Sequence, residues 1–285
     1  IQMPAPGHVG NVNPKQEKAL EAFRECLLNE QLISMENPPP YQETQLLRFL
    51  RARDFNVSAA YDMYVKTQEW KQRMDMDRLY EEFEFTEGPD VRRFGWRMYF
   101  HGTDKLGRPI FIQDLSGLDT DKVFSVTTAE RIVQNFAVTL EHAVRERYTA
   151  CTETQGHLVD DNYMVLNVQG IGLSTFWNMK SQLQSLLDVL DNNFPELSGR
   201  VQIINAPLLF TTIWNYVKGW LPTQTAAKID ICGTDYLPSI APYVDMRMWP
   251  KHLGGQCTCG QPPEQRACET SDFGPWPKSL DKQRE

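Results

Sequence analysis

Residues 195–228 read PELSGRVQIINAPLLFTTIWNYVKGWLPTQTAAK, and this stretch decides the fold. Its first part holds Val201, Ile203 and Ile204, β-branched residues in a short apolar run that is typical of a buried strand. Pro207 ends that strand, because proline has no N–H group to donate to a sheet. The stretch therefore predicts a buried strand followed at once by a different element.

The residues after Pro207 predict a helix over 208–221 with an unusual apolar surface. Its large apolar side chains recur at helical spacing: Phe210, Ile213, Trp214, Val217, Trp220 and Leu221. Tryptophan suits a surface that is apolar at one end and wet at the other, as at a bilayer interface. Two interpretations stay open, a helix packed in the core and a mobile lid over an apolar cavity. In the second, Lys228 would meet an anionic head group.

Other apolar runs predict an α/β fold. Strands are expected over 97–100, 109–113, 163–168, 201–204 and 229–232. Long helices that begin at Thr127 or Thr128 and at Ser174 separate the later strands. Strands that alternate with helices at this spacing indicate a mostly parallel sheet with right-handed crossovers.

The N-terminal part of the chain has a helical pattern instead. Asn13 and Pro14 form a helix start, a second helix is expected over 44–53, and Ser58 is expected to cap a third. A proline run at 38–40 separates the first two. We therefore predict a small all-helical lobe over 1–87 and a sheet-containing domain with a C-terminal tail over 88–285.

The overall composition excludes some classes of function. The chain has 285 residues and a net charge of −8, which argues against sequence-independent nucleic-acid binding and against membrane attraction by overall charge. No apolar run of about 18 residues is present, so no membrane-spanning helix is expected. The N-terminus has no signal-peptide pattern, and six cysteines are too few for a disulfide framework, so we expect reduced thiols in the cytosol.

Motifs of common enzymes and metal sites are missing. The sequence contains no GxGxxG after a predicted strand, no P-loop, no GxSxG and no HExxH, so we predict no catalytic residue and no cofactor. Its histidines show no metal-ligand spacing, and we interpret them as surface or hydrogen-bonded residues: His8, His101, His142, His157 and His252. Cys257, Cys259 and Cys268 cluster, but a zinc site would need a fourth ligand. We interpret them as structural or redox-labile thiols and predict no metal site.

Five motifs in order resemble a known family: LLRFLRARDFNV (46–57), HGTDKLGRPIFI (101–112), RVQIINAP (200–207), HLGG (252–255) and DFGPW (272–276). From about Thr44 to Trp276 the chain resembles the CRAL-TRIO family, and within it the phosphatidylinositol/phosphatidylcholine transfer proteins of the secretory pathway. The resemblance implies a sheet floor under an apolar pocket, gated by the helix over 208–221 and preceded by a helical lobe.

The same resemblance implies a function without catalysis. Such proteins bind a phospholipid, exchange single phospholipids between membranes, and present phosphatidylinositol to lipid kinases. This links them to phosphoinositide signalling and Golgi trafficking. The expected location is the cytoplasm, peripherally on Golgi or endosomal membranes, with a lipid kinase as a partner and a monomeric state.

The family's phosphoinositol residues can be carried over by position. They fall on Arg53, Glu196, Thr225 and Lys228. A lysine ammonium is a compact charge suited to a phosphate, and Glu196 would pair with it when no lipid is bound.

The family's phosphatidylcholine residues are largely replaced. Their positions hold Phe100, Phe111, Glu146, Asn162 and Met164 in place of tyrosines, a serine and a threonine. Phenylalanine keeps an aromatic wall but loses the hydroxyl group that would bond a phosphate. We therefore expect weak phosphatidylcholine binding and a second ligand that is another lipid or an apolar molecule such as a sterol.

Two other functions stay open at this point. The first is a carrier for a sterol, isoprenoid or haem, which would have no use for Lys228 paired with Glu196. The second is an α/β enzyme, which would need a nucleotide loop or a nucleophile that the motifs do not show. Because fold alone does not fix function, the distinction rests on the head-group residues.

Overall fold

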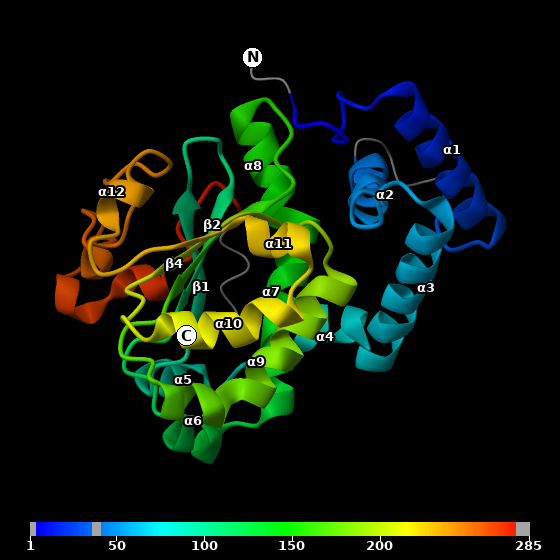
Figure 1. The fold of residues 1–285 in the computed structure, drawn as a ribbon. Coiled ribbons are helices and arrows are strands. Elements are labelled where there is room, and N and C mark those ends of the chain that lie inside the picture. Colours follow the sequence, from blue (N-terminus) through cyan, green and yellow to red (C-terminus); the bar gives the residue numbers. More distant parts are fainter. Residues whose placement is uncertain (1–3, 36–40, 278–285) are drawn as a thin grey trace. The chain divides into compact units, whose positions relative to one another are not determined.

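The computed structural model of the protein describes residues 4–35 and 41–277 (Figure 1). The chain forms two compact units, and each is described by itself below. The smaller unit comprises Ile1–Asp77 and Leu190–Glu196, and the larger comprises Arg78–Val189 and Leu197–Glu285. This division falls earlier in the chain than the domain boundary predicted after residue 87.

The smaller unit is built from the three predicted helices, α1 (Pro14–Asn29), α2 (Tyr41–Arg51) and α3 (Val57–Met74). Asn13 caps α1 as predicted, since its side chain accepts a hydrogen bond from the Gln16 backbone N–H. The predicted cap of the third helix, Ser58, is wrong by two residues. Asn56 is the cap, because its Oδ1 accepts from the backbone N–H of Ala59 at 3.0 Å.

A short segment from later in the chain completes this unit. The Thr67 hydroxyl of α3 donates to the carbonyl oxygen of Asn192 at 3.1 Å, and Trp70 packs edge-on against Phe194 with ring centroids 5.9 Å apart. The apolar core of the unit lies between its helices and consists of Leu20, Phe23, Leu27, Leu46, Leu47, Phe49, Leu50, Ala60, Met63 and Tyr64.

The larger unit contains a five-stranded sheet in the order β1-β2-β3-β4-β5. The strands are β1 (Arg97–Thr103), β2 (Pro109–Asp114), β3 (Asn162–Asn167), β4 (Ser198–Ile204) and β5 (Ile229–Ile231). β1 pairs with β2 antiparallel, and the other three pairings are parallel. The predicted mixed, mostly parallel sheet is confirmed.

Helices connect and cover these strands. Before β4 they are α4 (Met76–Glu82), α5 (Gly88–Arg93), α6 (Thr120–Val126), α7 (Ala129–His142), the π-helix η1 (Ala143–Arg147), α8 (Tyr148–Gln155) and α9 (Leu173–Asn193). After β4 they are α10 (Phe210–Val217), the 3₁₀ helix η2 (Lys218–Trp220), α11 (Thr223–Ala227), α12 (Leu237–Ile240) and the 3₁₀ helices η3 (Lys251–Leu253), η4 (Pro263–Gln265) and η5 (Ala267–Glu269). The first residues of α4 and the last residues of α9 belong to the smaller unit. Among the described residues, no helix combines the length and apolarity that crossing a bilayer requires.

The two faces of the sheet have different neighbours. Residues such as Tyr99 and Tyr163 face the chain that follows β5, in a core completed by residues up to Leu253. Because strand side chains alternate, Phe100, Phe111 and Met164 lie on the other face, which we call the helix face. Figure 1 shows α12 and α7 on opposite sides of the strands.

Candidate functional site

In the smaller unit, Arg53 lies just after α2 on an exposed turn. Its Nη1 donates to the carbonyl oxygen of Ala52 at 2.8 Å. The side chain lines a cleft of about 330 Å³ together with Ala59, Asp62, Met63, Lys66, Asn192 and Asn193. Two cations and two amides therefore line this cleft, beside one carboxylate.

Glu196 belongs to the same unit and has an unusual backbone. Its φ is +60°, a left-handed value that is uncommon for a residue other than glycine. Its Oε2 lies 3.8 Å from Nε of Arg51, whose side chain is only 9% exposed. The arginine of α2 that contacts this glutamate is thus Arg51, next but one to the predicted Arg53.

Thr225 and Lys228 lie together in the larger unit, at the end of α11. The Lys228 backbone N–H donates to the Thr225 carbonyl at 3.1 Å, so the two residues are one helical turn apart and their side chains are neighbours. Nζ of Lys228 is exposed and lies 3.5 Å from the carbonyl oxygen of Ser198 at the start of β4. Lys228 and Glu196 come from different units, so their pairing stays a prediction.

The helix face of the sheet brings three of the predicted second-lipid residues together. Phe100 and Phe111 are fully buried, opposite each other in register, and stacked with ring centroids 4.7 Å apart. Met164 is the neighbour of Phe111 on β3, and its sulfur lies 3.2 Å from the Ser198 hydroxyl. These side chains form an apolar and aromatic wall.

Asn162 adds a polar group at the start of β3. The residue is fully buried, and neither atom of its side-chain amide has a hydrogen-bond partner among the described residues. A buried amide in that state costs about 1–3 kcal/mol. A polar group of a ligand would remove this cost.

Glu146 lies apart from this wall. It accepts a hydrogen bond from the Tyr80 hydroxyl and lies 3.3 Å from Nδ1 of His142. Burial, followed by the hydrogen bond to Glu146, raises the pKa of Tyr80 well above its ordinary value, so the phenol keeps its proton and donates it. Nothing in this arrangement assigns Glu146 to a ligand.

The residue after Glu146 is the one that meets the aromatic wall. The Arg147 guanidinium lies over the Phe100 ring at 4.5 Å and over the Trp276 ring at 4.7 Å. Its Nη1 is 2.9 Å from Oδ1 of Asp272, and the two side chains are 3% and 0% exposed. A buried cation, fixed by an ion pair and two aromatic faces, therefore borders this wall.

Sequence reasoning missed Arg147 and the role of Asp272 and Trp276. DFGPW is one of the five family motifs, but no spacing in the sequence connects residues 272–276 to residue 147. Glu146 and Arg147 are the last two residues of the π-helix Ala143–Arg147, and their side chains point to Tyr80 and to Phe100 respectively. Single turns of π-helix are frequent at functional sites. A pattern of period 3.6 gives no sign of it.

The predicted gating helix is shorter than expected, because α10 begins at Phe210 and η2 ends at Trp220. Phe210 and Ile213 are buried, whereas the other predicted contact residues are half-buried: Trp214, Val217, Trp220 and Leu221. The Trp220 ring stacks on Phe176 of α9 at 6.1 Å. One apolar side of α10 is therefore buried, and η2 after it packs against the start of α9.

A second apolar surface at this helix faces solvent. We use the name outer patch for the large apolar side chains exposed at the two ends of α10, which with their exposed fractions are Leu208 (98%) and Leu209 (69%) before the helix, and Tyr216 (49%) with Trp177 (46%) near its end. Tyr216 and Trp177 are in edge-on contact at 5.2 Å. Exposed apolar patches of this kind mark interaction surfaces. The sequence analysis did not select these four residues, since periodicity alone cannot tell which side of an apolar helix is covered.

The arrangement defines a class of protein, an α/β domain with an aromatic-lined sheet face and an amphipathic covering helix, joined to a small helical unit. The CRAL/TRIO domain matches residues 93–255, and the CRAL/TRIO N-terminal domain matches residues 14–66. The chain belongs to the CRAL/TRIO family.

Named relatives agree with this assignment. The Sec14 cytosolic factor of Schizosaccharomyces pombe is 30% identical and covers 95% of this chain and 91% of its own length. The SEC14 cytosolic factor of Kluyveromyces lactis is 33% identical, over 95% of this chain and 87% of its own. The phosphatidylinositol/phosphatidylcholine transfer protein SFH12 of Arabidopsis thaliana is 34% identical over 91% of this chain, which is 47% of SFH12.

A solved structure supports the fold alone. The crystal structure of Sfh5 superimposes with a TM-score of 0.59 over 82% of this chain and 85% of Sfh5, at 12% sequence identity.

Proposed function

We propose that this protein binds phosphatidylinositol and transfers single phospholipids between membranes. The observation that carries the proposal is Lys228, an exposed cation one turn from Thr225, on the segment that follows α10 and the outer patch. An ammonium group beside a hydroxyl group suits a lipid phosphate, since a charge-assisted hydrogen bond is about twice as strong as a neutral one. Relatives named as phosphatidylinositol/phosphatidylcholine transfer proteins support the same chemistry.

Glu196 would hold the lysine when no lipid is present. The carbonyl that lies near Lys228 Nζ is that of Ser198, which follows Glu196 by two residues in the chain. Arg53 would add a second cation from the smaller unit, where it lines the cleft described above. An anionic head group would displace Glu196 from Lys228 and take its place.

The second ligand would not be phosphatidylcholine. One face of the Phe100 ring meets the Arg147 guanidinium and the ring also stacks on Phe111, so the aromatic surface that a choline needs is already used. A quaternary ammonium there would also be repelled by Arg147. The wall with the amide of Asn162 suits a ligand that is apolar and carries an uncharged polar group, such as a sterol or another lipid.

The outer patch supports contact with a membrane. Leu208 and Leu209 would enter a bilayer surface while α10 moves and uncovers its buried side chains Phe210 and Ile213, which would open a path for the lipid. We propose that this happens in the cytoplasm at Golgi or endosomal membranes, that the protein acts as a monomer, and that phosphatidylinositol presented at the open site reaches a lipid kinase.

Transfer of phosphatidylinositol between vesicles tests the head-group site. Lys228→Ala and Glu196→Ala should each slow transfer, and Lys228→Ala should do so by about 10- to 100-fold, the loss of one charge-assisted hydrogen bond. Lys218→Ala is the matched control, because Lys218 is an exposed cation on η2 outside the site. Equal transfer by the Lys228 and Lys218 variants, both folded, would place the head group elsewhere.

The second ligand is tested by mass spectrometry of lipids that copurify with the protein. We expect phosphatidylinositol and a lipid without choline. Abundant bound phosphatidylcholine would contradict the argument from Arg147. Absence of phosphatidylinositol in favour of a sterol would instead support the apolar-ligand carrier.

A further inference from the structure

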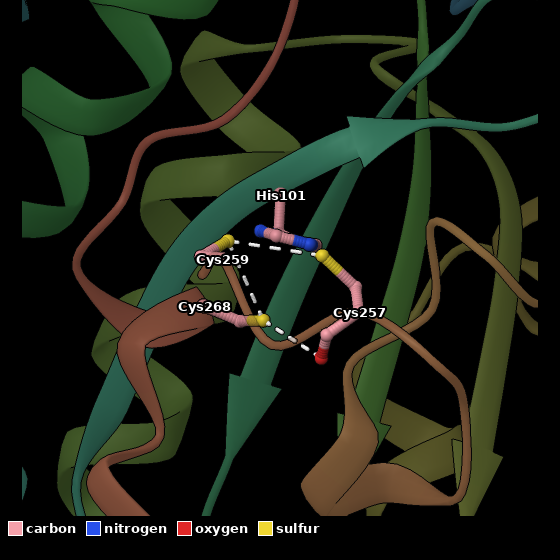
Figure 2. Close-up of side chains that lie close together, drawn as sticks. All are labelled: His101, Cys257, Cys259 and Cys268. Atoms are coloured by element: carbon pink, nitrogen blue, oxygen red, sulfur yellow. Dashed lines mark hydrogen bonds between the residues drawn. The ribbon is translucent and has the colours of Figure 1, made fainter. Parts of the chain in front are cut away.

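Three cysteines and one histidine from distant parts of the chain meet beside β1 (Figure 2). The residues are His101, Cys257, Cys259 and Cys268, and one potential ligand atom from each lies within 4.8 Å of the others. His101 and Cys268 are buried, and the other two are half-buried. Figure 2 shows the imidazole beside the sulfur atoms of Cys257 and Cys259, with Cys268 completing the group. Of the two interpretations given to His101, a surface or a hydrogen-bonded residue, the first is wrong, because the side chain is fully buried.

A β-bulge aims His101 at the cysteines. Phe100 pairs with Phe111 and Thr103 with Pro109, so two residues of β1, His101 and Gly102, stand opposite one residue of β2. Gly102 has φ +67°, a value that glycine adopts without strain. Bulges of this kind redirect a side chain and are common beside functional sites.

The cysteines are held in place by backbone contacts of their own. The Cys257 N–H donates to the Trp249 carbonyl at 3.0 Å, across a turn in which a Cβ on Gly255 would lie 2.0 Å from that oxygen. Cys268 lies on η5, and its thiol is 3.3 Å from the Cys257 carbonyl. The four side chains are therefore brought together by the fold of the chain.

The spacing of the sulfur atoms fits one tetrahedral ion. Sγ of Cys259 lies 3.8 Å from Sγ of Cys257 and 3.6 Å from Sγ of Cys268. Thiolates bound to one Zn²⁺ at about 2.3 Å in tetrahedral geometry stand about 3.8 Å apart. The described thiols are already close to that separation.

The histidine supplies an independent indication of a ligand. Nε2 of the fully buried His101 makes no hydrogen bond of good geometry among the described residues, although backbone groups of Met248 and Cys268 lie near the imidazole. Nδ1 lies 3.4 Å from the Ser271 hydroxyl, which is also 3.2 Å from Sγ of Cys259. A hydroxyl that contacts two ligands is the kind of supporting group that orients them around a metal.

We propose that His101, Cys257, Cys259 and Cys268 bind one Zn²⁺ in a structural site. Three thiolates and one imidazole form a Cys₃His set, which is typical of structural zinc, and soft sulfur ligands disfavour Mg²⁺ and Ca²⁺. Four protein ligands leave no open coordination position, so the ion takes no part in chemistry. Its role is to fasten the C-terminal segment to the edge of the sheet.

That segment carries the residues at the aromatic wall. The Gly102 N–H donates to the Phe273 carbonyl at 2.6 Å, directly after the proposed ligand His101. Asp272 and Trp276, which hold Arg147 over Phe100, follow Cys268 within a few residues. Zinc would therefore hold in place the C-terminal segment that positions Arg147 against the aromatic wall.

A second cluster of possible metal ligands lies nearby, and in it an arginine takes the place that a metal ion would have. Asp114, His252 and Glu269 also lie within 4.8 Å of one another. Arg266 contacts Asp114 at 3.2 Å and Glu269 at 3.1 Å, so these carboxylates already have a cation between them. Among the described residues, the contacts of the three thiols are to one another, to the Ser271 hydroxyl and to the Cys257 carbonyl, so the metal assignment is confined to the cysteine cluster.

The test is the metal content of the full chain, purified without chelators and without a metal-binding tag. Mass-spectrometric element analysis should find one zinc per chain, and the zinc should be lost in Cys259→Ser and in His101→Phe. Cys151→Ala is the control, since this buried cysteine of α8 lies outside the cluster and its loss should leave the zinc in place.

A rescue variant separates loss of a ligand from loss of the fold. His101→Cys supplies a thiolate in place of the imidazole and should keep the zinc. Cobalt exchanged into the native chain should show thiolate-to-cobalt charge-transfer absorption and the spectrum of a tetrahedral ion. Zinc retained by a folded Cys259→Ser variant, a metal-free native chain, or a disulfide among the three cysteines would each overturn the proposal.

Discussion

β1 and β5 are the two edge strands of one sheet, and they differ in length and in burial. β1 has seven residues, of which four are buried, and the segment after residue 256 covers it. β5 has three residues, of which two are exposed. Unpaired edges need protection. Among the described residues, β1 is mostly buried, whereas β5 is short and mostly exposed.

The contacts at the β1 edge tie distant parts of the chain together. The Arg147–Asp272 ion pair, the Gly102–Phe273 hydrogen bond and the His101–cysteine cluster all join the C-terminal segment to the body of the unit. Lys228, directly before β5, is exposed, and the outer patch at α10 meets solvent. Regions with few buried contacts open most easily.

The difference between the two edges suggests that they have different roles in a lipid carrier. One wall has to keep its shape so that a ligand finds the same surface in each cycle, and the opposite side has to open to let the lipid pass. On this account the β1 edge is the fixed wall, and the segment over 208–228 is the part that moves.

Removal of the proposed metal should have the largest effect, at the β1 edge. Structural zinc contributes directly to folding free energy, so a strong chelator should lower the melting temperature by about 5–10 °C, and added Zn²⁺ should restore it. Differential scanning fluorimetry measures this, with the Cys259→Ser variant as the control that should not respond. An unchanged melting temperature of the native chain would contradict a stabilising zinc ion at the β1 edge.

The outer patch should matter for membranes and not for stability. Leu208 and Leu209 are almost fully exposed, so changing both to serine costs little in folding but removes apolar area that could enter a bilayer. We expect vesicle binding to weaken about thirtyfold, from about 1 kcal/mol for each leucine. Liposome cosedimentation measures it.

The control for that variant comes from the opposite side of the sheet. Leu106 is 41% exposed in the turn between β1 and β2, so Leu106→Ser removes a similar apolar side chain from the fixed edge. It should leave vesicle binding unchanged. Equal losses in the two variants would mean that the membrane does not distinguish the edges.

Acid should weaken the β1 edge by a smaller amount. Burial, and then the charge of Arg266, lower the pKa of His252 to about 4 in the folded protein. Between pH 6.5 and 4 the unfolded chain binds a proton at this residue that the folded chain does not, so stability present above pH 6.5 is lost as pH falls. The groups that face His252 are Tyr99, Arg97, Asp114, Arg266, Glu269 and, at longer range, His101.

Urea unfolding at pH 7.5 and 5.5 tests this effect. The native chain should lose about 1 kcal/mol more than His252→Gln over this interval. The same pH dependence in both proteins would show that His252 does not titrate in this way.

Much of the fold could be predicted from the sequence because local signals agree with tertiary packing. Pro207 ends β4, Thr128 caps α7 through its contact with the Arg131 N–H, and the later strands have the expected parallel pairing. Lys228 and Thr225 were selected by resemblance, and their closeness follows from a single helical turn.

The residues that were missed depend on contacts between distant segments. His101 meets Cys257 only because a bulge in β1 and a tight turn at Gly255 bring residues more than 150 positions apart together. Arg147 reaches Phe100 through a π-helix that has no sequence signature. The exposure of Leu208 and Leu209 follows from where α10 begins, and the apolar pattern predicted the helix two residues too early.

Hydrogen–deuterium exchange followed by mass spectrometry, with and without vesicles that contain phosphatidylinositol, tests the central claim most directly. Peptides over 97–103 and 257–276 should stay protected and unchanged when vesicles are added. Peptides over 208–228 should exchange faster without vesicles and change strongly when vesicles are added. A change in β1 and the C-terminal segment, or none in 208–228, would contradict the account of a fixed edge opposite a moving one.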